Sequence, residues 1–240
     1  MIDIHCHILP AIDDGPATLA EALDMARIAV ADGVKTVFAT PHISPQGLQR
    51  EEVLAATTAL QEAVAAAGLD LRLLPGGDCS SHLDTDALCA NLMHNGPYLL
   101  LEFPHTYLPG DAAEQVFELT THGIIPVITH PERNADVLRD PKRLEPILEA
   151  GGLVQMTCQS LTGGFGVESR ACARHFLRQG YVHFLASDGH SASWRKPVLS
   201  AGYKVATRLI GVARANALVM DNPARLISGE RLGGDGACSS

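Results

Sequence analysis

The sequence lacks the features of a membrane or secreted protein. No apolar run approaches the roughly 20 residues that a membrane span requires. The N-terminus has no basic segment followed by an apolar one, which is the pattern of a signal peptide. The six cysteines are scattered without CxxC spacing, which favours reduced, buried thiols over a disulfide framework. We therefore expect a cytoplasmic protein with no membrane insertion.

An excess of basic charge is also missing. The chain has 18 Lys and Arg against 27 Asp and Glu, a formal net charge of −9. General nucleic-acid binding normally appears as a basic patch, so no nucleic-acid partner is expected. A phosphorylated substrate stays compatible with this charge, because bound metal cations would reverse the sign of the local field.

Short apolar runs alternate with helical patterns along the whole chain. Strands are predicted at 1–4, Thr36–Ala39, Leu71–Leu74, Tyr98–Leu101, Ile124–Ile128, Leu153–Met156 and Val182–Ala186. Helices are predicted between them, at 17–32, 51–67, 111–122, 141–150 and 167–179. The glycines that follow these helices have the position of a helix C-cap: Gly33, Gly68, Gly123, Gly151 and Gly180. Asp140-Pro141 and Asn222-Pro223 are each predicted to be an N-cap followed by the first helical residue.

Seven βα units with short connections indicate parallel strands that are buried on both faces. No composition shift or linker divides the chain, so we expect one α/β domain at 1–232 and a disordered tail at 233–240. A closed or nearly closed barrel is the favoured architecture, and an open doubly wound sheet is the alternative.

Possible metal ligands follow six of the seven predicted strands. In chain order they are His5 and His7, His42, Asp78, Glu102, His130, and finally Asp188 with His190. Each alone has an ordinary explanation as a cap, a turn residue or a solvated carboxylate. The carboxyl ends of barrel strands open on one face, so their joint placement favours a single site. Imidazoles and carboxylates together suit Zn, Mn or Fe.

The H-x-H spacing of the first motif supports this interpretation. Residues i and i+2 of a strand point to the same side, so His5 and His7 can converge on one cation while Cys6 packs on the other side. His105 is left undecided. No role in the site is expected for the remaining histidines, which are His82, His94, His122, His175 and His183.

The chain resembles the PHP (polymerase and histidinol phosphatase) superfamily, and within it the bacterial capsule and exopolysaccharide tyrosine phosphatases of the CpsB/YwqE type. The motifs that carry the resemblance are "MIDIHCHILPAIDDGP", "ATPH", "LLLEFP", "PVITHPER", "ASDGH" and "WRKP", in family order from residue 1 to about 228. The resemblance implies a distorted (β/α)7 TIM-like barrel, the PHP fold. It also implies a metal-dependent protein-tyrosine phosphatase that hydrolyses phosphotyrosine and regulates capsular or exopolysaccharide biosynthesis.

The resemblance further implies two or three divalent metal ions, Mn first, with Zn or Fe as alternatives. His5, His7, Asp78 and Asp188 would hold one ion. Asp78 would bridge to a second ion, which Glu102 and His130 complete, and Asp14, His42 and His190 would hold a third. The chain departs from the family at Asp78, where the family usually carries a glutamate that is one methylene longer.

The remaining implied roles concern substrate. Arg133 and Arg195 match family arginines that bind phosphate, a task that suits planar guanidinium groups, and Asp188 and His190 are candidates for assisting proton transfer. The implied partner is a phosphotyrosine protein, namely the tyrosine-rich tail of a polysaccharide co-polymerase kinase. The phenolate of tyrosine has a pKa near 10, so it leaves more easily than a serine alkoxide and needs less acid assistance.

Three alternatives compete with this hypothesis. One is another phosphomonoesterase of the superfamily, such as a histidinol-phosphate phosphatase, although those tend to carry histidine where this chain has Asp14 and Glu102. Another is a barrel that binds metal without catalysis. The third is a cysteine phosphatase, since Cys172–Arg178 matches the C-x5-R spacing. That segment has no glycine and has helical periodicity, so Cys172 is predicted to be a packing residue.

Overall fold

The structure is a computed structural model that describes residues 1–45, 47–94 and 96–232. The tail predicted at 233–240 lies outside the described residues. Within the described ranges, no helix is long and apolar enough to cross a membrane.

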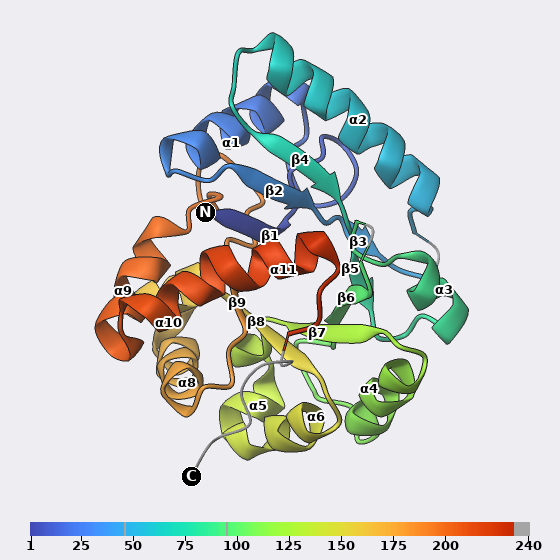
Figure 1. The fold of residues 1–240 in the computed structure, drawn as a ribbon, viewed down its shortest axis with the longest axis vertical. Coiled ribbons are helices and arrows are strands. Elements are labelled where there is room, and N and C mark those ends of the chain that lie inside the picture. Colours follow the sequence, from blue (N-terminus) through green and yellow to red (C-terminus); the bar gives the residue numbers. More distant parts are fainter. Residues whose placement is uncertain (46, 95, 233–240) are drawn as a thin grey trace.

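The strands form two parallel sheets (Figure 1). One sheet has the order β1-β2-β4 and the other β3-β5-β6-β7-β8-β9. Their bounds are β1 Ile2–Cys6, β2 Thr36–Ala39, β3 His42–Ile43, β4 Arg72–Pro75, β5 Asp78–Ser80, β6 Tyr98–Glu102, β7 Ile125–Thr129, β8 Leu153–Thr157 and β9 Phe184–Ala186. The predicted α/β class with parallel strands is confirmed.

The two sheets meet at two places. Thr40-Pro41 links β2 to β3, and Gly76-Gly77 links β4 to β5. At each of these links the chain passes directly from one sheet into the other. At the other side, an isolated parallel bridge joins Cys6 of β1 to Gly189, which follows β9. Among the described residues the strands do not form one continuous closed sheet, so the predicted barrel stays a prediction.

The helices cover the outer faces of the sheets, with α1 and α2 beside β1, β2 and β4 (Figure 1). Their bounds are α1 Leu19–Ala31, α2 Arg50–Ala66, α3 Thr85–Ala90, α4 Ala112–Thr121, α5 Ala135–Arg139, α6 Glu145–Glu149, α7 Cys158–Thr162, α8 Gly166–Gln179, α9 Ser200–Ile210, α10 Val212–Asn216 and α11 Asn222–Ser228. Single turns lie at η1 Pro131–Arg133 and η2 Pro141–Leu144, and a π-helical turn at η3 Ala217–Asp221.

Local signals in the sequence explain where many helices begin and end. The side chain of Thr18 accepts a hydrogen bond from the backbone N–H of Glu21 and caps α1, and Gln49 and Glu52 form a capping box at α2. The five glycines predicted at helix ends all adopt positive φ angles, between 69° and 95°.

Two corrections concern the helices. The helix predicted at 141–150 is divided into η2 and α6, and Pro146 stands at the start of α6. Asn222 is not an N-cap, since the chain passes from η3 directly into α11 and Asn222 has helical angles. Its side chain instead donates to the backbone oxygen of His183. Asp140 is confirmed as a cap, because its carboxylate accepts from the N–H of Lys142.

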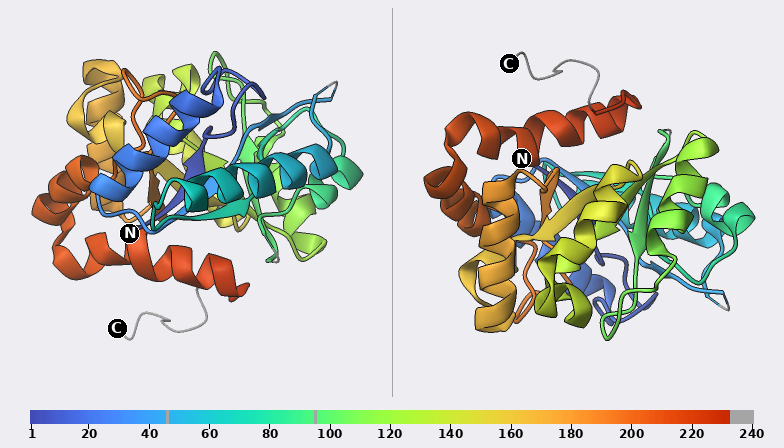
Figure 2. Two further views of the ribbon diagram at one scale, coloured as in Figure 1. Left: turned by 90° about the horizontal axis from the view of Figure 1, so that it is seen from above. Right: turned by 90° about the horizontal axis from the view of Figure 1, so that it is seen from below.

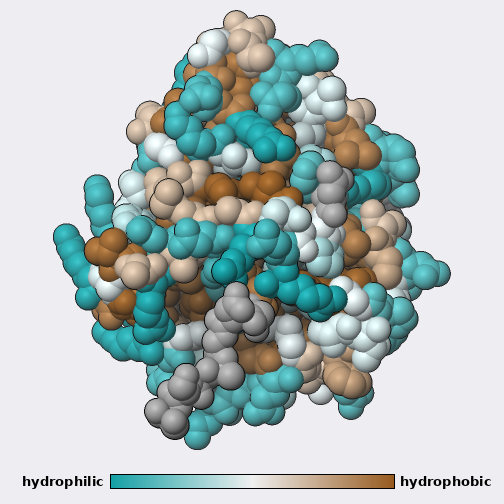
Figure 3. Space-filling model, viewed as in Figure 1, coloured by the Kyte–Doolittle hydropathy of each residue, from teal (hydrophilic) through white to brown (hydrophobic). Residues whose placement is uncertain are grey.

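Alternate residues of β2 and β6 enter different parts of the core. In β6, Tyr98 and Leu100 join one buried cluster, while Leu99 and Leu101 join the larger cluster that packs against the helices. Leu226 of α11 belongs to the first cluster, and α11 lies across one end of the strands (Figure 2). Hydrophilic side chains cover much of the face in Figure 3. The polar groups of the next section lie at the opposite, carboxyl ends of the strands.

Candidate metal centre

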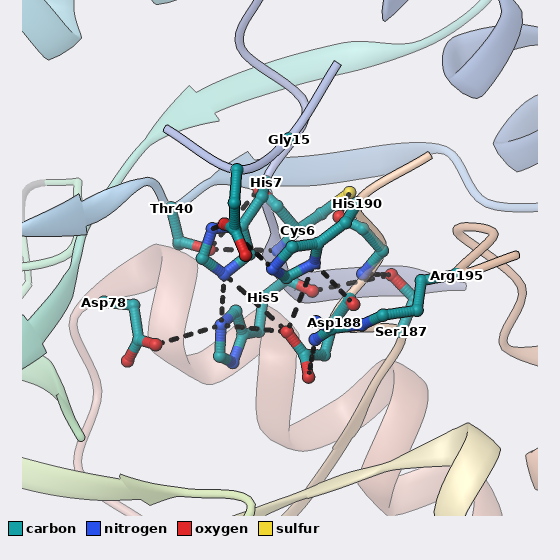
Figure 4. Close-up of polar contacts among 12 residues, drawn as sticks. His5, Cys6, His7, Gly15, Thr40, Asp78, Ser187, Asp188, His190 and Arg195 are labelled. Carbon is teal, nitrogen blue, oxygen red and sulfur yellow. Dashed lines mark hydrogen bonds and ion pairs between the residues drawn. The ribbon is translucent and has the colours of Figure 1, made fainter. Parts of the chain in front are cut away.

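His5 lies in β1 and His7 just after its C-terminal end, and their side chains point at each other. The Nε2 atoms of His5 and His7 lie 3.1 Å apart (Figure 4). On the far side of each ring, His5 Nδ1 donates to Gln155 Oε1 at 3.0 Å and His7 Nδ1 donates to Asp13 Oδ2 at 2.7 Å. When both rings are neutral, these bonds leave the Nε2 lone pairs facing one another, an arrangement that a shared cation stabilises.

Two buried carboxylates complete this part of the cluster. Asp78 Oδ2 lies 3.4 Å from His5 Nε2, and Asp188 Oδ1 lies 3.6 Å from the Nε2 atoms of both His5 and His7. Both Asp78 oxygens are buried and have no hydrogen-bond donor among the described residues. A buried carboxylate without a donor is costly, so the donor set fits a metal cation.

A second group surrounds Glu102 at the end of β6. Its oxygens lie 3.3 Å from His42 Nδ1 and 3.5 Å from Nε2 of both His130 and His105. The rings of His105 and His130 are stacked with centroids 5.0 Å apart. His105, which the sequence left undecided, thus joins the site.

A third group faces solvent. Asp14 Oδ1 lies 3.3 Å from His190 Nε2 and 3.6 Å from His42 Nε2. Asp14 is 61% exposed, whereas His190 is buried. The residues able to share an ion thus form overlapping sets, in which His42 lies close to both Asp14 and Glu102.

The backbone is strained at two of these positions. His130 and Asp188 have φ angles of 35° and 50°, which only a few per cent of non-glycine residues adopt. His130 directly follows β7, and Asp188 lies two residues after the end of β9. Such strain is typical of functional sites. A side chain at Gly15 would come within 2.3 Å of the His7 carbonyl oxygen, so the turn that carries Asp13 and Asp14 requires glycine there.

Arg133 and Arg195 meet at Asp188. Both guanidinium groups pair with Asp188 Oδ2, and the Nε of Arg195 is buried with no hydrogen-bond partner among the described residues. With Asp14, His42, Glu102, His105, His130 and His190, these residues line a cavity of about 470 Å³. The cavity therefore brings two cationic arginines together with possible metal ligands.

The carboxylates favour positive charge in the cluster. Burial lowers the pKa of His5, but Asp78 and Asp188 outweigh it and raise that pKa to about 9. The pKa of His42 is likewise raised to about 9, against burial, by Glu102 and Asp78. Although burial opposes ionisation of Asp188, His5 and the two arginines hold its pKa well below the usual range.

Three groups that support the site were not singled out from the sequence. Asp13 orients His7 and Gln155 orients His5. Phe165 lies against Arg133. Asp13 stands beside the predicted ligand Asp14, but nothing in the sequence distinguishes the two roles. The other five histidines belong to none of the candidate metal groups found among the described residues.

Cys172 lies inside α8 rather than in a phosphate-binding loop. Its neighbours Ala173, Phe176 and Leu177 are buried with it, as predicted. Burial, and secondarily the charge of Glu132, raise the pKa of the Cys172 thiol to about 12. At neutral pH this group is therefore a protonated thiol and a poor nucleophile.

Comparisons with known proteins give consistent matches. The family described as "Capsular polysaccharide synthesis, CpsB/CapC" matches residues 1–228. Tyrosine-protein phosphatase YwqE of Bacillus subtilis is 36% identical over 202 residues, which cover 81% of this chain and 79% of the relative. Tyrosine-protein phosphatase CpsB of Streptococcus agalactiae is 30% identical over 233 residues, covering 92% of this chain and 96% of the relative.

A solved structure agrees over nearly the whole chain. It comes from a study of YwqE from Bacillus subtilis and CpsB from Streptococcus pneumoniae, described as unique metal-dependent tyrosine phosphatases. It has a TM-score of 0.92 and 32% sequence identity, and the match covers 97% of this chain and 96% of the other.

Proposed function

This chain belongs to the CpsB/CapC family, and on that premise we propose that it is a metal-dependent tyrosine-protein phosphatase. The observation that carries the proposal is a cluster of six histidines and four carboxylates that meets two arginines at one cavity. A site that only bound structural metal would need neither the open cavity nor the arginines.

We assign the ligands to two or three divalent ions, with Mn first and Zn or Fe as alternatives. His5, His7, Asp78 and Asp188 would hold the first ion. Asp78, Glu102 and His130 would hold the second, and Asp14, His42 and His190 would hold the third. Support comes from the overlapping candidate groups, since Asp78 lies in one with His5 and His7 and in another with His42 and Glu102. When bound, the ions would neutralise phosphoryl charge and activate water.

The chain's own residues would bind and orient the phosphoryl group. Arg133 and Arg195 present guanidinium groups to the cavity and would hold the phosphoryl oxygens through charge-assisted hydrogen bonds. Besides its proposed place among the metal ligands, Asp188 would anchor the two arginines, and its lowered pKa makes it unsuited to donate a proton. His190 lines the same cavity and is the remaining candidate for assisting the phenolate, whose pKa near 10 calls for little help.

The biological role follows from the family alone. We propose that the enzyme acts on a phosphotyrosine protein in capsular or exopolysaccharide synthesis, and that this protein is the tyrosine-rich tail of a polysaccharide co-polymerase kinase. The family description supports the first part. The kinase tail comes from the sequence resemblance only, and the cytoplasmic location stays the expectation stated in the sequence analysis.

We also propose that the two sheets together make a distorted seven-unit barrel. The backbone N–H of His7 donates to the Gly189 oxygen and the N–H of Asp188 donates to the His5 oxygen, each at 2.9 Å. The carboxylate of Asp3 accepts from the N–H and the hydroxyl of Ser187, next to β9. These bonds support closure between β1 and β9.

A panel of phosphomonoesters tests the proposal. The purified protein, supplied with Mn²⁺, should hydrolyse p-nitrophenyl phosphate and a phosphotyrosine peptide faster than a phosphoserine peptide or histidinol phosphate. Added chelator should abolish the reaction. Preference for histidinol phosphate would favour the alternative phosphomonoesterase, and inactivity on the whole panel would favour metal binding without catalysis.

A further inference from the structure

A glycine-rich turn between α7 and α8 presents one aromatic side chain to the site. Gly163 and Gly166 flank the turn with φ angles of 94° and 92°, a conformation that residues with a side chain rarely adopt. Phe165 stands between them and is half-buried. The turn therefore places Phe165 through backbone geometry that glycine permits.

The ring of Phe165 lies against both phosphate-site arginines. The guanidinium carbon of Arg133 is 4.3 Å from the ring centroid, and that of Arg195 is 5.7 Å away. These distances lie within the range of cation–π attraction. Since both guanidinium groups also pair with Asp188 Oδ2, they contact a carboxylate oxygen as well as a ring face.

The two contacts restrain different motions. A single carboxylate oxygen fixes one end of a guanidinium group but permits rotation about that contact. The face of an aromatic ring restrains the plane of the group, because planar guanidinium groups stack on such faces. The orientation of the plane decides whether two N–H groups can bind two phosphoryl oxygens at once.

We propose that Phe165 is a positioning residue that holds Arg133, and with it Arg195, in the orientation that binds the phosphoryl group. This inference rests on the proposed function, because it takes the two arginines as phosphate binders. Trp194 also lies over Arg195, with 5.5 Å between the ring centroid and the guanidinium carbon, but among the described residues it makes no such contact with Arg133 and it is 63% exposed.

The proposal makes a specific claim about substrates. The ring contact of Phe165 is made to Arg133, so its loss should weaken binding of every phosphate ligand to the same degree. A residue that stacked on the tyrosine ring of substrate would behave differently. Its loss would affect aryl phosphates and leave inorganic phosphate unchanged.

The test compares Phe165→Leu with Phe165→Tyr, which keeps the ring, in protein loaded with Mn²⁺. Phe117→Leu is the matched control, since Phe117 is an exposed residue of α4 outside the cavity lining. Calorimetry should show inorganic phosphate binding about tenfold more weakly to Phe165→Leu, equal to about 1.4 kcal/mol. The KM for p-nitrophenyl phosphate should rise by a similar factor, while Phe165→Tyr and Phe117→Leu stay within about twofold of the parent.

Metal content and thermal denaturation are measured on each variant, and Phe165→Met replaces Phe165→Leu if the latter is unfolded. Unchanged phosphate affinity in the ringless variant would overturn the proposal, as would a loss confined to the aryl ester or a parent that binds no phosphate. If the parent binds phosphate yet hydrolyses no ester, the proposed function fails, and the calorimetric comparison still decides the role of Phe165.

Discussion

Asp78 is the residue whose replacement should be most informative. Its carboxylate is buried, lies 3.4 Å from His5 Nε2 and 3.7 Å from His42 Nδ1, and receives no hydrogen bond from the described residues. It belongs to two of the candidate metal groups. If it bridges two ions, Asp78→Ala should lower metal content and activity together. Asp78→Glu, which introduces the residue that the sequence resemblance implies here, should keep much of the activity and change which ion works best.

The size of the effect follows from mass action. Loss even of a residue that only orients a ligand weakens metal binding by about 10- to 100-fold, so loss of a shared ligand should do at least as much. An ion present at 100 times its Kd stabilises the fold by about 2.7 kcal/mol, and a 100-fold weaker ion by only about 0.4 kcal/mol. For a chain of this size, the metal-induced rise in Tm should shrink by about 5–9 °C.

Elemental analysis and thermal denaturation with and without Mn²⁺ measure both quantities. Asp70→Ala is the control, because Asp70 is an exposed carboxylate paired with Lys35. The control should keep the metal content, the rate and the metal-induced shift of the parent. If Asp78→Ala also kept all three, Asp78 would be an ordinary buried carboxylate and the bridging assignment would be wrong.

Four further outcomes are expected. Exhaustive chelation should abolish phosphatase activity and Mn²⁺ should restore it, so activity that survives chelation would exclude the metal mechanism. Cys172→Ser should turn over within about threefold of the parent, whereas a thousandfold loss, or a phosphocysteine detected by mass spectrometry, would show a thiol nucleophile. Arg133→Ala should retain its metals by elemental analysis but lose about 2–4 kcal/mol of transition-state stabilisation in kcat/KM. Burial lowers the pKa of His183 to about 4, so the unfolding free energy should fall as the pH drops from about 6.5 towards 4, by up to roughly 3 kcal/mol. Denaturant titrations should show a flatter profile for His183→Asn, which keeps an acceptor for the N–H of Val154.

Most of the longer strands could be predicted because they are short, largely apolar runs. Tyr98–Leu101 and Leu153–Met156, for example, were each found with one further residue at the end. The short strands β3 and β5 could not be predicted, because their pairing depends on where neighbouring segments lie and not on apolar character. His42 and Asp78 therefore turned out to pair with one another in a sheet, where the sequence indicated only loop residues after strands.

The convergence of ligand types could also be predicted, because parallel strands bring their carboxyl ends to one face. Which ligand binds which ion is harder to predict from the sequence. His42 lies 3.6 Å from Asp14 and 3.3 Å from Glu102, and these distances depend on the ring's rotamer, which no spacing in the sequence specifies. His105 was ambiguous for the same reason, since its stacking on His130 depends on the path of the loop after β6.

The pair Asp13 and Asp14 shows what decides such roles. The two residues are chemically identical neighbours, yet the Asp13 side chain is 7% exposed and that of Asp14 is 61% exposed. The chain at Gly15 packs against the His7 carbonyl, and the Gly15 N–H donates to the Asp13 carboxylate. The same carboxylate also accepts from His7 Nδ1 and from the N–H of His42. That bond fixes the tautomer of His7, which leaves its Nε2 free to bind a cation. The ligand geometry thus depends on a turn whose glycine is visible in the sequence, but whose packing partner is visible only in the fold.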